Sequence, residues 1–321
     1  MNYRRFGRLG WQVAEVGFGT WGMGGWSGSD DDRSRAALRR GLESGCNFLD
    51  TALVYGNGRS ERLIQEVLAD WSGPRPIIAT KMPPKNGRFP ALASDPLDEV
   101  YPADYIRATT ERSLANLGIG QVDLQQFHVW TDAWADDEEW LRAVSALKEE
   151  GLVKGIGISL NRWQPTSVFK ALRTGAIDAV QVVYNIFDQA PEDELFPLCR
   201  ELDVAVIARV PFDEGSLTGT MTPGDTWPEG DWRNTYFTPV KLRETLSRVD
   251  KVKADLPAGM TLPDAALRFI LHHPAVSTVI PGMRTVSHVE RNLAAGDGQP
   301  FPATLLAAMR RHRWDRTPVV S

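Results

Sequence analysis

The stretch Asn47-Phe-Leu-Asp-Thr-Ala-Leu-Val-Tyr-Gly-Asn-Gly-Arg-Ser-Glu61 joins a short apolar strand to a helix through a turn with ionisable side chains. Residues 47–49 form the strand, which runs directly into Asp50. Tyr55 lies on the turn beside two glycines, and Ser60-Glu61 has the pattern of a helix start. In a parallel α/β barrel the carboxyl ends of the strands share one rim. We therefore expect Asp50 and Tyr55 to lie together at that rim.

The next two predicted strands also end on side chains that carry or exchange protons. Residues 76–81 end on Lys81, and residues 122–128 end on His128. If these strands belong to one parallel sheet, Asp50, Tyr55, Lys81 and His128 meet at the same rim. A carboxylate, a phenol, an ammonium group and an imidazole in one place form a set able to move a proton.

Strand and helix patterns alternate along the whole chain. Apolar runs typical of buried parallel strands occupy residues 13–18, 47–49, 77–80, 122–127, 153–158, 179–183, 204–208 and 276–280. Helical patterns between them occupy residues 31–44, 60–69, 103–117, 136–149, 165–173, 192–202 and 262–272. Eight such units favour a closed (β/α)8 barrel over an open doubly wound sheet. No linker-like segment divides the chain, so we expect residues 1–321 to form a single domain.

Bulk composition narrows the class of protein. The chain has 36 Lys and Arg residues against 41 Asp and Glu residues, so its formal net charge is −5. No basic run suggests a nucleic-acid face, no apolar run approaches the ~20 residues of a membrane helix, and the N-terminus lacks a signal-peptide pattern. Cys46 and Cys199 are expected to be reduced core residues, which favours the cytoplasm. The five histidines show no metal-ligand spacing. We expect a cytoplasmic protein that acts on a small molecule.

The long connections after three strands predict a substrate pocket. Residues 22–30, 83–102 and 211–239 are too long for plain turns, and all would overhang the same rim. The aromatic side chains in these connections could simply anchor the loops to the barrel. Together they more readily wall an apolar pocket. The aromatic residues assigned to this pocket are Trp21, Trp26, Phe89, Trp130, Trp227 and Trp232.

One dinucleotide-binding signature is expected to be a false match. Gly17-Phe-Gly-Thr-Trp-Gly22 fits GxGxxG directly after a strand. That motif needs a helix to open at the glycines so that its amides meet a pyrophosphate. Here Met23-Gly-Gly-Trp-Ser-Gly-Ser29 follows, and the first credible helix cap is near Ser29-Asp30. A Rossmann fold is therefore disfavoured.

These motifs, in this order and spacing, resemble the aldo-keto reductase family over nearly the whole chain. The opening is Tyr3-Arg-Arg-Phe-Gly-Arg-Leu-Gly10 followed by Val16-Gly-Phe-Gly-Thr20, and the signature is Gly45-Cys-Asn-Phe-Leu-Asp-Thr-Ala52 with Tyr55-Gly56. The closing segment is Pro263-Asp-Ala-Ala-Leu-Arg-Phe-Ile270, then Val279-Ile-Pro-Gly-Met-Arg284 and Asn292. The resemblance implies a TIM barrel with an N-terminal β-hairpin and long loops at the C-terminal rim.

The resemblance also implies reversible hydride transfer between a nicotinamide nucleotide and a carbonyl, alcohol or sugar. Tyr55 would be the general acid, Lys81 the cation that eases its proton loss, Asp50 the partner of Lys81, and His128 the group that orients the carbonyl oxygen. Arg284 would hold the 2′-phosphate, which favours NADP(H), with NAD(H) possible. The implied cofactor-binding residues are Gly19, Thr20, Trp21, Asp50, Ser159, Asn161, Gln181, Arg209, Pro211, Gly215, Leu217, Gly219, Gly282, Arg284, His288 and Asn292.

Three positions depart from the family pattern. The usual Ser-Asn pair reads Ser159-Leu160-Asn161, the aromatic residue after the seventh strand is replaced by Arg209, and His288 stands where relatives commonly have Arg or Gln.

Two other functions remain open from the residues. Lys81 at a barrel strand end is suited to Schiff-base chemistry in a lyase or aldolase if burial lowers its pKa. The same fold also serves as a nucleotide-sensing regulatory subunit in some relatives, but the presence of all four catalytic residue types favours an enzyme.

Overall fold

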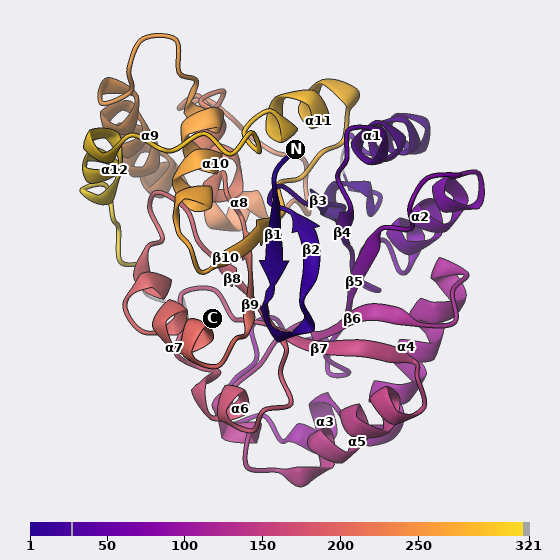
Figure 1. Ribbon diagram of the computed structural model, residues 1–321. Helices are drawn as coiled ribbons and strands as arrows, with labels where there is room; N and C mark the ends of the chain where they lie inside the picture. Colours follow the sequence, from indigo (N-terminus) through magenta and orange to yellow (C-terminus); the bar gives the residue numbers. More distant parts are fainter. Residues whose placement is uncertain (27, 317–321) are drawn as a thin grey trace.

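The computed structural model describes residues 1–26 and 28–316 and contains an eight-stranded parallel sheet that curls into a barrel (Figure 1). Neighbouring strands pair in chain order. The sheet closes because Gly17 N donates to Val279 O at 2.8 Å and Gly19 N donates to Pro281 O at 3.0 Å. The barrel strands are β3 Phe18–Gly19, β4 Phe48–Asp50, β5 Ile77–Met82, β6 Val122–Phe127, β7 Val153–Ser159, β8 Ala179–Val183, β9 Ala205–Arg209 and β10 Val276–Val279.

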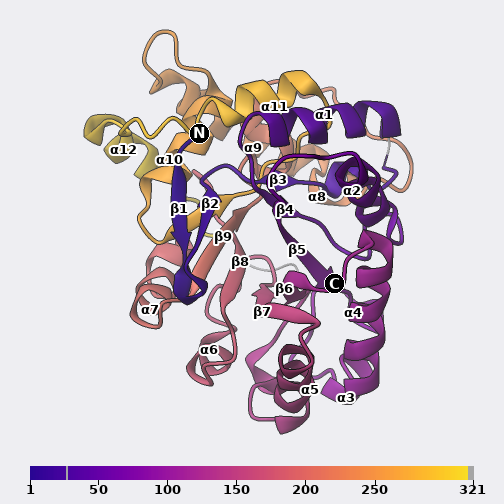
Figure 2. The ribbon, with the colours of Figure 1, turned by 45° about the vertical axis from the view of Figure 1, so that its right-hand side comes forward.

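Helices form an outer ring around these strands (Figures 1 and 2). The first of them shows why such segments are helical: Asp30 caps its start by accepting from Arg33 N at 2.8 Å, and Ala37, Leu38 and Leu42 bury one face. The longer helices are α1 Asp31–Glu43, α2 Arg59–Ala69, α4 Ala103–Leu117, α5 Glu138–Glu149, α7 Leu195–Glu201, α9 Pro239–Ala254, α10 Leu262–His272, α11 Val286–Leu293 and α12 Ala303–Arg310. Shorter ones are α3 Leu97–Val100, α6 Phe169–Arg173 and α8 Arg233–Tyr236.

An antiparallel hairpin, β1 Tyr3–Phe6 and β2 Trp11–Ala14, lies across the amino-terminal end of the barrel (Figure 1). Phe6 is fully buried against Phe48, with ring centroids 5.4 Å apart, and closes that end of the barrel core. Gly7 has φ of 43°, and a Cβ there would lie 2.5 Å from Ala205 N. Only glycine allows the hairpin this close approach.

The predicted first strand, residues 13–18, is wrong as one element. Val13 and Ala14 belong to the hairpin, whereas the barrel strand β3 begins at Phe18. Between them Val16 forms only an isolated bridge to Val279. The apolar run is continuous because both the hairpin and the barrel strand are buried, and burial alone does not reveal that the chain changes its pairing partner.

The long connections lie at the opposite, carboxyl end of the strands. The connection 83–102 contains α3 and the connection 211–239 contains α8, while the connection 22–30 includes Ser27, which lies outside the described residues. Within residues 1–26 and 28–316, no helix is both long enough and apolar enough to cross a membrane. The barrel thus presents one open rim, overhung by loops, where strand ends gather.

Candidate active site

A buried ion pair between Lys81 and Asp50 lies at the centre of the rim. Lys81 Nζ lies 2.6 Å from Asp50 Oδ1, and the two side chains are 0% and 2% exposed. The same ammonium group donates to Thr51 O at 2.8 Å and lies 3.5 Å from the hydroxyl of Tyr55. An ammonium group has three donors, so these three partners use all of them. Lys81 is therefore held by the protein and does not line the cleft.

The second carboxylate oxygen of Asp50 is also held. Gln181 Nε2 donates to Asp50 Oδ2 at 2.7 Å, and Gln126 Nε2 donates to the same oxygen at 3.3 Å. Gln181 lies in the middle of β8, where it pairs with Ser159 at the carboxyl end of β7. Gln126 was not expected from the sequence, although its position in β6 just before Phe127 and His128 points it toward the same core.

Tyr55 is held over this ion pair and faces a cleft. The Lys81 ammonium lies 5.2 Å from the centre of the Tyr55 ring. Burial raises the pKa of the Tyr55 phenol above its ordinary value, and the Lys81 cation offsets part of that rise. The expected cation, Lys81, lies near the phenol, but burial is the larger influence on the pKa of Tyr55. The phenol is consequently protonated at neutral pH, as a proton donor must be.

His128 follows β6 and lies beside Tyr55, with ring centroids 5.9 Å apart in an edge-on arrangement. Phe89 packs against its other side at 5.1 Å. Burial, with the Lys81 and Arg209 cations, lowers the pKa of His128 well below its ordinary value. The imidazole Nδ1 is buried and has no hydrogen-bond partner among the described residues. The ring is thus neutral at physiological pH.

Tyr55 and His128 open into a cleft of about 630 Å³, a size typical of small-molecule sites. Its apolar wall includes Val54, Phe89, Trp232 and the stacked pair Trp21 and Trp26, whose ring centroids are 4.9 Å apart. The cleft extends past β9 and β10 toward the start of α11. The predicted cofactor residues that line it are Gly19, Trp21, Asp50, Gln181, Arg209, Pro211, Gly215, Gly282, Arg284 and His288.

The remaining predicted cofactor residues do not line this cleft. Thr20 is 1% exposed and binds the backbone of Asp50, with its hydroxyl donating to Asp50 O at 2.9 Å. Asn161 Nδ2 donates to Ala91 O at 3.0 Å and to Gln164 Oε1 at 2.9 Å, so this amide fastens the connection 83–102 instead. The expectation that Asn161 faces the cofactor therefore disagrees with its placement. The other members outside the lining are Ser159, Leu217, Gly219 and Asn292.

Two of the predicted pocket aromatics also lie elsewhere. Trp130 is 0% exposed and packs on Trp140 and Trp134, with ring centroids 5.1 Å and 5.6 Å away, so its assignment to the pocket is corrected to the helix–barrel core. Trp227 stacks on Phe237 at 5.4 Å and does not line the cleft. A position just beyond a strand end does not determine whether a side chain points into the rim or outward.

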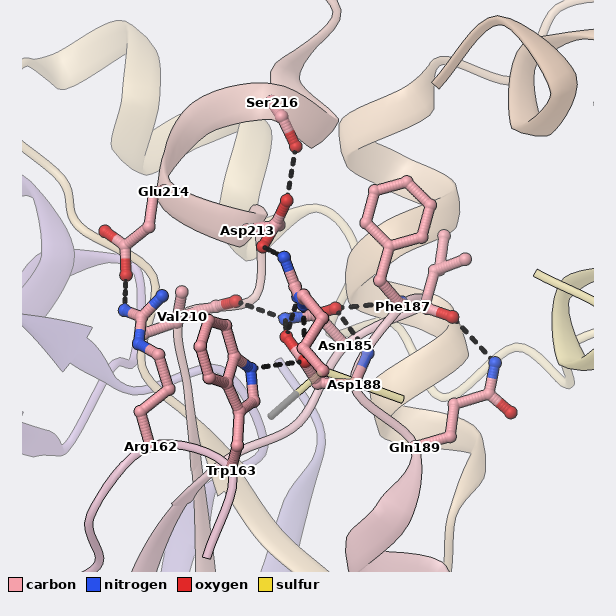
Figure 3. A network of polar contacts seen from close by, with 12 residues as sticks. Arg162, Trp163, Asn185, Phe187, Asp188, Gln189, Val210, Asp213, Glu214 and Ser216 are labelled. Carbon is pink, nitrogen blue, oxygen red and sulfur yellow. Dashed lines mark hydrogen bonds and ion pairs between the residues drawn. The ribbon is translucent and has the colours of Figure 1, made fainter. Parts of the chain in front are cut away.

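An ion pair in the lining of the cleft was not expected. Arg162, from the segment after β7, pairs with Glu214 in the 3-10 segment η5 Asp213–Thr218, and both line the cleft (Figure 3). The Arg162 guanidinium also lies 4.8 Å from the ring of Tyr236 and 5.3 Å from that of Trp232. Beside it, Asp213 accepts from the hydroxyl of Ser216 at 2.8 Å (Figure 3). Local sequence patterns gave no signal for this long-range pair beyond the charges themselves.

The loop that carries Glu214 has backbone geometry typical of a functional turn. Val210, a β-branched residue, has φ of 57°, and Asp213 and Glu214 follow with φ of 43° and 57°. Such left-handed conformations are costly for these residues and persist only where the surroundings hold them. Asn185 does so in part, because its Nδ2 donates to Val210 O at 3.1 Å (Figure 3).

Several features of the cleft fit a nicotinamide dinucleotide. Gly19, Gly215 and Gly282 line it and allow close approach to backbone, while Arg209 Nε and Arg162 Nη1 are buried without hydrogen-bond partners among the described residues. Thr285 caps α11 by accepting from His288 N at 3.2 Å. Arg284 and His288 are at this helix start, where phosphate groups are favoured.

Comparison with known proteins defines the class. A sequence profile of the Aldo/keto reductase family matches residues 15–313, and the chain belongs to this family. It is 28% identical over 300 residues to the aldo-keto reductase YhdN of Bacillus subtilis, covering 90% of this chain and 87% of that protein. It is also 28% identical over 299 residues to the NADH-specific methylglyoxal reductase of Escherichia coli, covering 88% and 90%.

A solved structure agrees with these sequence matches. The holo form of the aldo-keto reductase AKR11C1 from Bacillus halodurans superposes with a TM-score of 0.77 at 26% identity, covering 99% of this chain and 98% of that one. The predicted family and the (β/α)8 barrel with its hairpin are thereby confirmed, and the protein is an oxidoreductase of the aldo-keto reductase class.

Proposed function

We propose that this protein reduces an aldehyde or ketone, or oxidises the corresponding alcohol or sugar, with NADP(H) and with Tyr55 as general acid and base. The observation that carries the proposal is the Tyr55 hydroxyl at the floor of the cleft, 3.5 Å from the Lys81 ammonium and beside His128. Three of the four predicted catalytic side chains, those of Asp50, Tyr55 and His128, line one cleft, and Lys81 lies directly beneath it.

In reduction, Tyr55 gives its hydroxyl proton to the substrate oxygen as that oxygen gains negative charge. A bound nicotinamide cofactor supplies the hydride for the carbonyl carbon. The phenolate left on Tyr55 is stabilised by Lys81, whose charge acts at short range inside the barrel. Asp50 keeps that ammonium in place, and Gln181 and Gln126 keep Asp50 in place. In oxidation the same groups act in reverse, with the phenolate as base.

His128 orients the substrate and does not supply the proton. Its lowered pKa keeps it neutral, so it carries one ring N–H. An N–H on the buried Nδ1 would have no acceptor, which is costly, so the proton belongs on Nε2. In this tautomer Nε2–H donates to the carbonyl oxygen that Tyr55 protonates. The substrate oxygen is thereby held between two donors.

The preference for NADP(H) is proposed from the start of α11. Arg284 lines the cleft there and offers a planar donor group suited to a 2′-phosphate. Burial and the Arg291 and Arg284 cations lower the pKa of His288, so this histidine adds no charge at neutral pH. The E. coli relative is NADH-specific by name, so family membership alone does not determine which nucleotide is bound. The proposed preference therefore rests on Arg284 and His288.

Replacing Tyr55 with Phe tests the proposal. The change keeps the ring and removes the transferable proton, so kcat for aldehyde reduction should fall by about 10²–10⁴-fold, while NADPH binding, followed by tryptophan fluorescence quenching, should persist. Tyr184→Phe is a matched control, because Tyr184 is also buried but its hydroxyl donates to Glu192 at 2.7 Å, outside the cleft. A Tyr55→Phe enzyme as fast as the Tyr184→Phe enzyme would contradict the assignment.

A further inference from the structure

Arg209, the last residue of β9, places a partly buried cation at the catalytic end of the cleft. Its guanidinium lines the cleft, and Nη2 donates to Leu160 O at 2.8 Å. Nε is buried without a hydrogen-bond partner, and no carboxylate within residues 1–26 and 28–316 forms an ion pair with this side chain. Burial lowers the pKa of Arg209 to about 10, with the Arg162 cation as a further cause. The group is therefore still charged at neutral pH.

The neighbouring charges are already compensated. The Lys81 ammonium is paired with Asp50, and the Arg162 guanidinium is paired with Glu214. His128 is neutral. Arg209 is thus the cation at the catalytic end whose only hydrogen bond within the described residues goes to a backbone carbonyl. A partly buried charge without a carboxylate partner is unfavourable, and an anionic ligand would relieve that cost through a charge-assisted hydrogen bond to the buried Nε.

The position of Arg209 indicates which ligand carries the anion. Its charge opposes part of the rise that burial causes in the pKa of Tyr55, and it adds to the fall in the pKa of His128. The guanidinium is therefore within electrostatic reach of the two groups that contact the substrate oxygen. The start of α11 with Arg284, proposed above for the 2′-phosphate, is a separate part of the cleft beyond β10.

We propose that the substrate is an oxo acid, a carbonyl compound whose carboxylate pairs with Arg209 while Tyr55 and His128 hold its carbonyl oxygen. The apolar body of the substrate would lie against Trp21, Trp26, Phe89 and Trp232. The inference rests on the proposed reductase function. The carboxylate takes no part in the chemistry: hydride adds to the carbonyl carbon, the Tyr55 proton adds to the oxygen, and the product is a hydroxy acid.

The test compares carboxylates with neutral esters of the same shape. Wild-type holoenzyme is assayed with para-carboxybenzaldehyde, with succinic semialdehyde and with the methyl ester of each. A charged hydrogen bond of about 1.5–3 kcal/mol predicts that kcat/KM favours the carboxylate by about tenfold to over a hundredfold. Arg209→Gln removes the charge and should abolish this ratio, whereas Arg209→Lys should retain part of it. Because the ratio is internal to each protein, partial misfolding of a variant does not affect it.

Controls separate the possible failures. Arg142→Gln, at an exposed pair with Glu138, should leave the ratio unchanged. Equilibrium binding of para-hydroxymethylbenzoate and its amide, followed by tryptophan fluorescence, should show the same preference without turnover. Reduction of esters and carboxylates at equal rates would overturn the inference and leave the reductase function standing. An Arg209→Gln variant that keeps the ratio but binds NADPH more weakly would also overturn the inference. The Arg209 charge would then serve to bind the cofactor. If the wild type reduces neither carboxylate but reduces other aldehydes with NADPH, the oxo-acid inference falls and the reductase function stands.

Discussion

Replacing Lys81 with Met isolates the role of the buried ion pair. Methionine keeps much of the lysine stem but leaves the Asp50 carboxylate, 2% exposed, with only the amide donors of Gln181 and Gln126 as partners for its side chain. Removing one member of a buried pair costs about 3–5 kcal/mol, since the other charge stays buried. The double variant Lys81→Met/Asp50→Asn removes both charges and should regain most of that loss.

Urea unfolding followed by tryptophan fluorescence measures both effects. Lys170→Met is a matched control, because Lys170 and Asp136 are also 2.6 Å apart but are 57% and 76% exposed. A pair so exposed contributes about 0–1 kcal/mol. We expect the free energy of unfolding to fall much further in Lys81→Met than in Lys170→Met. Aldehyde reduction should fall by at least about a hundredfold in both Lys81 variants, because Tyr55 loses its supporting charge.

Two results would refute this reasoning. Equal losses of stability in Lys81→Met and Lys170→Met would mean that burial does not set the energy of the Asp50–Lys81 pair. A double variant that reduces aldehydes at the wild-type rate would mean that Lys81 has no influence on proton transfer by Tyr55. Restored stability without restored activity is the predicted combination, because it separates the structural role of the pair from its chemical one.

Two further predictions concern pH and nucleotide choice. Because the pKa of His128 is lowered, its contribution to stability is fully present above about pH 6.5 and is lost as the pH falls. The free energy of unfolding should therefore fall less steeply with decreasing pH in His128→Asn. Because the pKa of Tyr55 is raised, kcat/KM for reduction should stay level to about pH 10, and a fall centred near neutral pH would contradict this. NADPH should bind more tightly than NADH by about tenfold to over a hundredfold. Arg284→Ala should remove that preference in a fluorescence titration, and a variant that keeps it would refute the assignment.

The barrel and the placement of Asp50, Tyr55, Lys81 and His128 at one rim could be predicted because they depend on local order along the chain. An apolar strand that ends on Asp50, Lys81 or His128 places that residue at one rim whatever the loops do. The bounds of α4 and α10 also follow from local signals, such as the Thr261 cap that accepts from Asp264 N. The site assignments themselves stay predictions until the variants are measured.

Features that depend on which way a side chain points could not be predicted. Trp130 lies two residues after His128, yet it turns into the helix–barrel core while His128 faces the cleft. The Arg162–Glu214 pair joins residues far apart in the chain, and no local pattern distinguishes it from two solvated charges. The sequence also did not reveal that residues 13–18 are divided between the hairpin and the barrel, because both strands are equally apolar.

We propose that the departures from the family pattern affect selectivity and leave proton transfer intact. The Asn161 amide forms hydrogen bonds with the backbone of Ala91 and so holds that loop in place. His288 lines the far end of the cleft but is held neutral there. Arg209 alone of the three brings charge to the place where the substrate oxygen would lie. In the proposed mechanism Asp50, Tyr55, Lys81 and His128 move the proton, which leaves the partly buried charge of Arg209 for recognising the substrate.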